Sequence, residues 1–191
     1  GTTAAGVTAD SKYYGAAAVV GTSVFFAPAN EDNIGVYDTT ASVFSTIDIT
    51  AAGVTADYKY HGAAAVGTSV FFAPYKEGNV GVYDTTTGTF SIIAAGPGGR
   101  AYAGAVAVDT NVIFTPFNEE NVGVFDTTTS TFSTIEINAV DFGGDAYQGE
   151  AAVGTSVVFA PSIEDNVGVL VLLSASSPCL RIETGTAEWY G

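Results

Sequence analysis

Residues 62–93 read GAAAVGTSVFFAPYKEGNVGVYDTTTGTFSII, and this stretch decides the fold because similar copies of it lie on either side. The proline that ends its FFAP run recurs at Pro28, Pro74, Pro116 and Pro161. A glycine follows each of these prolines by seven residues, so the copies keep one register. The chain therefore contains four copies of a unit of about 45 residues, and a unit of this size cannot bury its apolar face alone.

Four short strands are predicted within each unit, and their side chains change from small to polar along the unit. In the second copy, 62–66 is rich in Gly and Ala, 70–73 is apolar on both faces, and 79–84 alternates. The last strand, as in residues 132–137 of the third copy, puts isoleucines on one face and polar residues on the other. Small side chains suit an innermost strand and a half-exposed strand suits the rim. We therefore predict an all-β fold, a β-propeller with four blades of four antiparallel strands.

Other arrangements of these strands stay open. A β-sandwich also uses short strands joined by turns, but it gives no reason for a Gly/Ala strand in every unit. A five-bladed ring and an array of associated repeats are the alternatives to four blades. In a four-bladed ring we expect blades 1 and 4 to pack on each other, because the chain begins at an inner strand and ends at an outer one.

A single domain, residues 1–191, is predicted to hold all the repeats. The repeats occupy approximately residues 10–50, 57–94, 99–138 and 145–183, and a tail follows at 184–191. In the fourth repeat the GVYDTTT turn becomes GVLVLLS, but Leu180 and Ile182 keep the alternation expected of an outer strand.

The segment 82–91, VYDTTTGTFS, resembles the turn between the third and fourth strands of kelch-like propeller blades. The double glycine and the tryptophan of kelch repeats are absent from it. Over nearly the whole chain, the unit resembles uncharacterised propeller-like repeats of marine algal proteins. Both resemblances imply a propeller fold, and neither implies an activity.

The charge balance narrows the range of partners. The chain has five Lys and Arg against twenty Asp and Glu, which gives a net charge of −15. Such a field repels phosphate backbones and anionic lipid surfaces, so we expect neither nucleic acid nor a membrane as a partner. Cations, carbohydrate, proteins and self-association stay open.

No targeting signal in the sequence indicates a cellular compartment. The first residues lack the basic segment and apolar core of a signal peptide, and no uncharged run is long and unbroken enough to span a bilayer. Cys179 is the only cysteine, so an internal disulfide is excluded. We expect a soluble protein of unknown compartment.

Candidate binding residues gather at one end of the predicted propeller, where the loops between blades meet the loops between second and third strands. A tyrosine stands two residues before each inner-strand glycine, at Tyr13, Tyr60, Tyr102 and Tyr147. Charged residues precede these tyrosines, at Asp10, Asp57, Arg100 and Asp145. A ring of such groups could bind a sugar, a peptide or a cation, because an aromatic ring offers apolar area and a polar group together. In the alternative interpretation, each tyrosine packs between blades and is architectural.

The position after each of these tyrosines differs between the copies: Tyr14, His61, Ala103 and Gln148. A ligand site breaks symmetry more readily than architecture does, so we predict that Tyr14, His61 and Gln148 contribute to binding. His61 is the only histidine, and the acidic loops lack a calcium-binding spacing. No metal site and no cofactor are predicted, although an axial cation stays open.

Catalytic motifs such as the P-loop, G-x-S-x-G and HExxH are absent, so no catalytic residue is predicted and the chain is interpreted as a non-enzyme. The preferred function is a binding or interaction module with its ligand or partner at the axial opening. The alternative is a purely structural or self-assembling repeat protein without a small ligand. A hydrolase that uses Asp57 or Asp145 ranks below both.

Overall fold

The computed structural model describes residues 6–96, 98–137 and 144–172, which form four antiparallel sheets in chain order. Blade 1 contains β1 (Ala18–Val20), β2 (Ser23–Phe26), β3 (Asn33–Asp38) and β4 (Val43–Asp48). Blade 2 contains β5 (Tyr60–Val66), β6 (Ser69–Pro74), β7 (Asn79–Asp84) and β8 (Thr89–Ala94). Blade 3 contains β9 (Tyr102–Val108), β10 (Asn111–Pro116), β11 (Asn121–Asp126) and β12 (Thr131–Glu136). Blade 4 contains β13 (Tyr147–Val153), β14 (Ser156–Pro161) and β15 (Gly168–Val171).

Every blade follows the same meander, in which each strand pairs with the next one along the chain. A short 3₁₀ helix, Thr50–Ala52, lies in the connection from blade 1 to blade 2. The propeller-type sheets predicted from the repeat are therefore confirmed. The outer strand expected around Leu180 and Ile182, the tail and Cys179 lie outside the described residues.

The Gly/Ala-rich strands lie innermost, as predicted, and they follow one another in the order β1, β5, β9, β13. Glycine is required where these strands meet. A Cβ atom on Gly15 would lie 2.5 Å from the backbone nitrogen of Gly62, and one on Gly62 would lie 3.1 Å from Cα of Gly104. Backbones can approach this closely only without side chains, which explains the small residues in every copy.

The Asp-Thr-Thr segments form the predicted turns between third and fourth strands. The Asp84 carboxylate accepts a hydrogen bond from the backbone N–H of Thr86 at 2.7 Å, and Asp38 and Asp126 do the same in their blades. These hydrogen bonds lower the pKa of Asp84 and of Asp126. The aspartates are therefore local turn-formers.

The core consists of three apolar clusters, and each cluster fills the junction between two neighbouring blades. Aromatic rings meet across the first two junctions. The ring centroids of Phe25 and Tyr83 are 5.8 Å apart, and those of Phe71 and Phe125 are 5.2 Å apart. The junctions between blades thus supply the burial that a single unit cannot provide.

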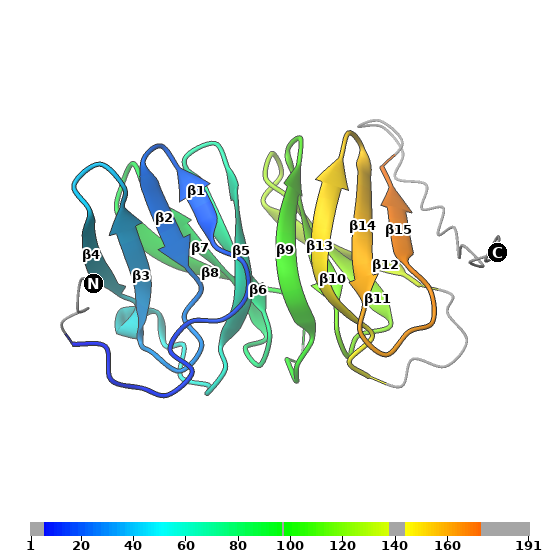
Figure 1. Cartoon of the computed structure of the whole chain (residues 1–191), viewed down its shortest axis with the longest axis horizontal. Helices are drawn as coiled ribbons and strands as arrows, with labels where there is room; N and C mark the ends of the chain where they lie inside the picture. The colour runs from blue at the N-terminus through cyan, green and yellow to red at the C-terminus, as the bar shows by residue number, and fades with distance from the viewer. Residues whose placement is uncertain (1–5, 97, 138–143, 173–191) are drawn as a thin grey trace, which may run out of the picture.

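The four blades form an open arc. Figure 1 shows blade 1 and blade 4 at the two sides of the molecule, with β5 and β9 between them. Val108 of blade 3 is 4% exposed, whereas the matching Val153 of blade 4 is 69% exposed. The predicted packing of blade 1 on blade 4 is therefore absent among the described residues. A closed four-bladed ring needs a turn of a quarter circle per blade, and in an open arc the turn per blade is smaller. Within the described ranges, no helix is both long and apolar enough to cross a membrane.

Candidate functional site

Three of the four repeated tyrosines, Tyr60, Tyr102 and Tyr147, are buried within the blades, and Tyr13 is partly buried. The ring of Tyr102 lies against Gly123, where a Cβ atom would come within 3.0 Å of it. Its hydroxyl donates a hydrogen bond to Oδ1 of Asn121 at 2.6 Å. Tyr13 and Tyr60 make the same contacts in their blades, and Tyr147 lies against Gly168. We therefore assign these tyrosines an architectural role.

In blades 1, 2 and 3 the tyrosine begins a chain of hydrogen bonds that continues through an asparagine to a glutamate of the acidic loop. In blade 1, Asn33 Nδ2 donates to Oε2 of Glu31 at 3.3 Å, and Oε1 of Glu31 accepts the Ala9 N–H at 2.7 Å. Burial, and then the charge of Glu31, raise the pKa of Tyr13 to about 12. In blade 2, Glu77 binds the backbone of the preceding loop in the same way. Glu31 thus holds the segment before blade 1, and Glu77 holds the connection between blades 1 and 2.

A belt of backbone hydrogen bonds joins the blades at the end where these loops lie, which we call the loop end. Its members are the residues before each tyrosine and after each proline: Lys12, Ala29, Lys59, Tyr75, Ala101, Phe117, Ala146 and Ser162. Each member after the first donates its N–H to the carbonyl of the member before it, at 2.8 to 3.1 Å. The belt holds the backbones of Tyr75 and Phe117 at fixed positions on the loop end.

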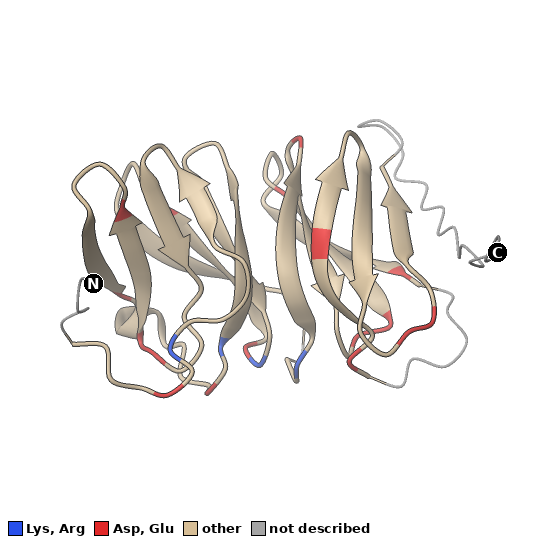
Figure 2. Cartoon of the chain, viewed as in Figure 1, with Lys and Arg blue, Asp and Glu red and all other residues tan. Residues whose placement is uncertain are grey.

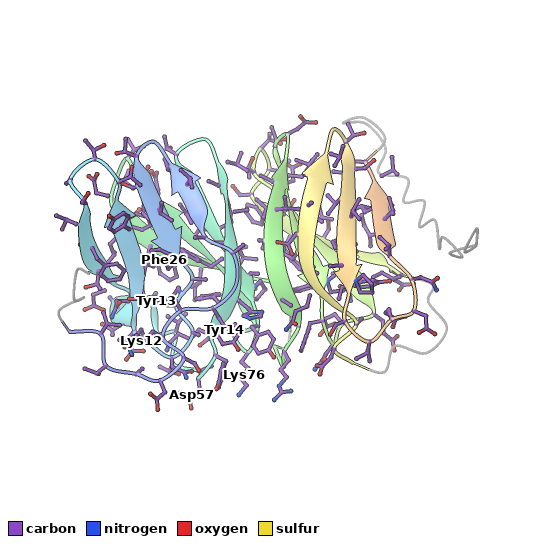
Figure 3. The ribbon with its side chains drawn as sticks, viewed as in Figure 1. Lys12, Tyr13, Tyr14, Phe26, Asp57 and Lys76 are labelled. Carbon is purple, nitrogen blue, oxygen red and sulfur yellow. The ribbon has the colours of Figure 1, made fainter. Side chains whose placement is uncertain are left out.

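Four aromatic side chains from three blades form a row on the loop end, which we call the aromatic row: Tyr14, His61, Tyr75 and Phe117. Successive ring centroids are 4.5, 5.1 and 5.6 Å apart. Tyr58 flanks the row, with its ring 6.5 Å from that of Tyr14. Figure 3 shows Tyr14, Asp57 and Lys76 at this end of the molecule.

Charged groups of both signs surround the row. Burial raises the pKa of Tyr75, the charge of Arg100 opposes this rise, and the charge of Asp145 adds to it. Lys76 Nζ lies 4.9 Å from the centre of the Tyr58 ring, within the range of a cation–π contact. Figure 2 shows the described Lys and Arg gathered at this end, together with Asp and Glu. The row therefore offers apolar faces beside hydrogen-bond donors and acceptors.

His61 lies between Tyr14 and Tyr75 in the row and is only 8% exposed. Its Nδ1 has no hydrogen-bond partner among the described residues. Burial lowers the pKa of His61, and a hydrogen bond to the backbone of Ala103 acts in the opposite direction. The imidazole is therefore neutral near pH 7, with one polar atom unsatisfied inside the row.

The loop residue two positions before each repeated tyrosine has a left-handed backbone: Ser11, Tyr58, Arg100 and Asp145, with φ between 52° and 65°. Such a conformation is uncommon for residues other than glycine. Asparagine side chains stabilise two of these loops. Asn30 Oδ1 accepts the Tyr58 N–H, and Asn118 Oδ1 accepts the Asp145 N–H, both at 2.8 Å. The same backbone thus presents a different side chain at each blade.

A pocket of about 220 Å³ lies between blades 2 and 3. Its polar lining includes Glu77, Tyr102 and Glu119. The pocket exists because the connection between blades 2 and 3 is shorter than the one between blades 1 and 2, where Ile49 and Val54 are buried in the junction. None of the four residues of the aromatic row lines this pocket.

One inner strand carries a charged residue. Glu150 of β13 stands where blades 2 and 3 have alanine. Its Oε2 accepts a hydrogen bond from the hydroxyl of Thr115, which is fully buried in blade 3. Burial raises the pKa of Glu150, while Thr115 and the Ala105 backbone oppose the rise. Thr115 and Glu150 thus replace an alanine–alanine contact of the other junctions.

The structure brings together some of the predicted site residues. Tyr14, His61, Arg100 and Asp145 belong to the aromatic row or its surroundings. Asp10 is exposed in the segment before blade 1, Asp57 is exposed in the connection between blades 1 and 2, and Gln148 is exposed on β13. No cluster of three or more potential metal ligands occurs in the part of the chain that the structure describes.

Three aromatic residues of the site were missed from the sequence: Tyr58, Tyr75 and Phe117. Tyr75 and Phe117 follow the repeated proline directly, where blades 1 and 4 have Ala29 and Ser162. The same loss of symmetry that identified Tyr14 and His61 was therefore present at this position and could have identified them.

Sequence comparison finds no matching family profile and no matching curated protein. Solved structures do match the fold. A streptogramin B lyase is 15% identical, with a TM-score of 0.69, and the match covers 94% of this chain and 56% of that one. A catalytically inactive virginiamycin B lyase from Staphylococcus aureus with quinupristin is 16% identical, with a TM-score of 0.66, and coverages of 82% and 51%. The WD40 repeats of RRP9 are 12% identical, with a TM-score of 0.61, and coverages of 85% and 46%.

These likenesses show the β-propeller fold. At such low identity they carry no activity to this chain, and they include lyases as well as WD40 repeats. The chain spans about half the length of the solved structures it matches. The narrower kelch-like assignment stays a prediction.

Proposed function

We propose that this chain is a binding module whose ligand lies on the aromatic row at the loop end. The observation that carries the proposal is the row itself, which continues across three blades although the repeat does not require it. Blades 1 and 4 have small residues after the proline, and blade 3 has alanine in the position of His61. His61 and Phe117 are buried, while Tyr14 and Tyr75 stay partly exposed. Partly exposed aromatic side chains that break the symmetry of a repeat indicate recognition rather than architecture.

A neutral carbohydrate is the ligand that this chemistry fits best. Tyr14 is 46% exposed and Tyr58 is 37% exposed, so flat apolar faces are available to the C–H face of a sugar ring. Arg100, Asp145 and Lys76 supply donors and acceptors around these faces for sugar hydroxyls. The net charge of −15 disfavours an anionic ligand.

Catalysis ranks below binding. Lyases occur among the proteins of similar fold, so the fold itself does not exclude an enzyme. The row offers one neutral histidine, and the sequence contains no catalytic motif. A purely structural role without a ligand rests on different residues, those on the open faces of blades 1 and 4.

Screening on a glycan array, followed by calorimetric titration of the best oligosaccharide, tests the proposal. We expect Tyr14→Ala to weaken binding by about five- to thirtyfold, since loss of a stacked ring removes about 1–2 kcal/mol. Tyr14→Phe keeps the ring and should retain affinity. Val43→Ala is the control, because Val43 is exposed on β4 in a different blade position. An array without a binder, or binding that is insensitive to Tyr14→Ala and Tyr58→Ala, would overturn the proposal.

A further inference from the structure

Among the described residues, blades 1 and 4 each have one apolar face without a neighbour. On blade 1, Val19, Val24 and Tyr37 lie side by side in register on the face that points away from blade 2. On blade 4, Ala151, Val158 and Val169 lie side by side on the face that points away from blade 3. None of these six residues is fully buried, and Val19 is 60% exposed.

The residues that match these two faces are buried at the three internal junctions. Val70, Val112 and Val157 are the counterparts of Val24, and none of the three is exposed to solvent. Ile113 of blade 3 is the counterpart of Val158 and is also fully buried. Each junction joins a face of the blade 4 type to a face of the blade 1 type. The two open faces are therefore the two halves of one further junction.

We propose that a second copy of this chain completes the ring, with blade 4 of each copy packed against blade 1 of the other. Two copies joined in this way make two identical head-to-tail junctions and a closed ring of eight blades. A heterologous contact of this kind closes into a ring when its rotation is the right fraction of a circle.

The backbone belt supports the same junction. Within the chain, the residue after each proline accepts the N–H of the residue before the next tyrosine, as from Lys59 to Ala29 and from Ala146 to Phe117. The belt ends at Ser162, whose carbonyl has no such donor among the described residues, and begins at Lys12, whose N–H has no such acceptor there. In the proposed ring, Lys12 of one copy donates to Ser162 of the other, and the belt becomes continuous.

The size of the arc supports two copies. The chain matches between 46% and 58% of the length of three different solved structures: the RRP9 repeats, the streptogramin B lyase and a chain of a nidogen–laminin complex. An arc that matches about half of such a protein needs about one further arc of the same size to close. Charge limits the association, because each copy brings a net charge of −15. Added salt screens this repulsion and should strengthen the dimer.

Sedimentation equilibrium of the full chain, over a range of protein concentrations and in 0.05 and about 0.5 M NaCl, tests the proposal. We expect a dimer that strengthens with salt. Val153→Lys on blade 4 and Val19→Lys on blade 1 should each weaken it at least about tenfold, because both junctions of the ring would have to bury an ammonium group. Val43→Lys is the matched control. Val43 is 53% exposed, and blades 2 and 3 have threonine in its place, outside the repeated contact.

Mixing the two variants distinguishes the head-to-tail ring from other dimers. An equimolar mixture of Val153→Lys and Val19→Lys chains has one unaltered junction per pair, so a heterodimer should return. A dimer that is sensitive to Val153→Lys but not to Val19→Lys would mean that blade 4 pairs with itself, and it would overturn the proposal. A wild-type monomer under all conditions, or growth into open polymers, would overturn it as well. None of these measurements involves the aromatic row, so they are independent of the proposed ligand site.

Discussion

The ring of Tyr60 lies directly over Gly81, so that a Cβ atom on this glycine would come within 2.9 Å of the tyrosine Cζ. Phe90 crowds the same point from the neighbouring strand, also at 2.9 Å. The glycine of the repeated VGVYD segment is therefore required by the tyrosine of the preceding inner strand. This relationship recurs in all four blades.

Gly81→Ala should destabilise the protein by about 1–3 kcal/mol, because the added methyl group overpacks a buried site. Gly35→Ala in blade 1 is the comparison. Tyr13 lies over Gly35 at the open end of the arc and is only partly buried, so it can move away more easily and the loss should be smaller. Urea denaturation followed by circular dichroism measures both variants. Equal losses at the two positions would contradict this explanation.

The stability of the protein should fall as the pH is lowered through about 6.5, the ordinary pKa of histidine. Burial lowers the pKa of His61 in the native state, so the unfolded chain takes up the proton first and acid favours unfolding. His61→Phe should remove this pH dependence between pH 7.5 and 5.5 and keep the aromatic row intact. Because His61 is the only histidine, unfolding free energies at the two pH values report on it directly. A slope that persists unchanged in the variant would refute the assignment.

Thr115 and Glu150 should be energetically coupled across the junction of blades 3 and 4. Glu150→Ala alone leaves the buried hydroxyl of Thr115 without its acceptor, and Thr115→Ala alone removes a donor from a half-buried carboxylate. The double variant restores the alanine pair that Ala73 and Ala105 form one junction earlier. We expect a coupling free energy of about 1 kcal/mol or more from a double-mutant cycle. Additive losses would show that the contact is energetically unimportant.

The repeat made the blades predictable from the sequence. The glycines of the inner strands and the Asp84 turn follow from local sterics and local hydrogen bonds, which a single sequence displays. The curvature of the arc does not follow from them. It depends on how apolar faces such as those of Phe71 and Phe125 fit at each junction, and the pattern of strands within a blade does not specify that fit.

The candidate site was predictable in part for a similar reason. Asymmetry between the copies identified Tyr14 and His61, whose neighbours along the chain are architectural. Tyr75 escaped notice because it comes from a loop after a different strand, and only the backbone belt brings that loop beside His61. Contacts between blades decide which asymmetric positions meet, and the pattern within one copy does not predict these contacts.

At the four left-handed loop positions, the backbone belongs to the scaffold and the side chain belongs to the surface. Ser11, Tyr58, Arg100 and Asp145 share one backbone shape, which an asparagine side chain stabilises at Tyr58 and at Asp145, while their side chains differ in size, charge and aromaticity. Replacing such a side chain alters the surface offered to a ligand without disturbing the blades beneath. A scaffold of this kind can acquire new specificities one residue at a time, and an engineer can vary these four positions as an independent set.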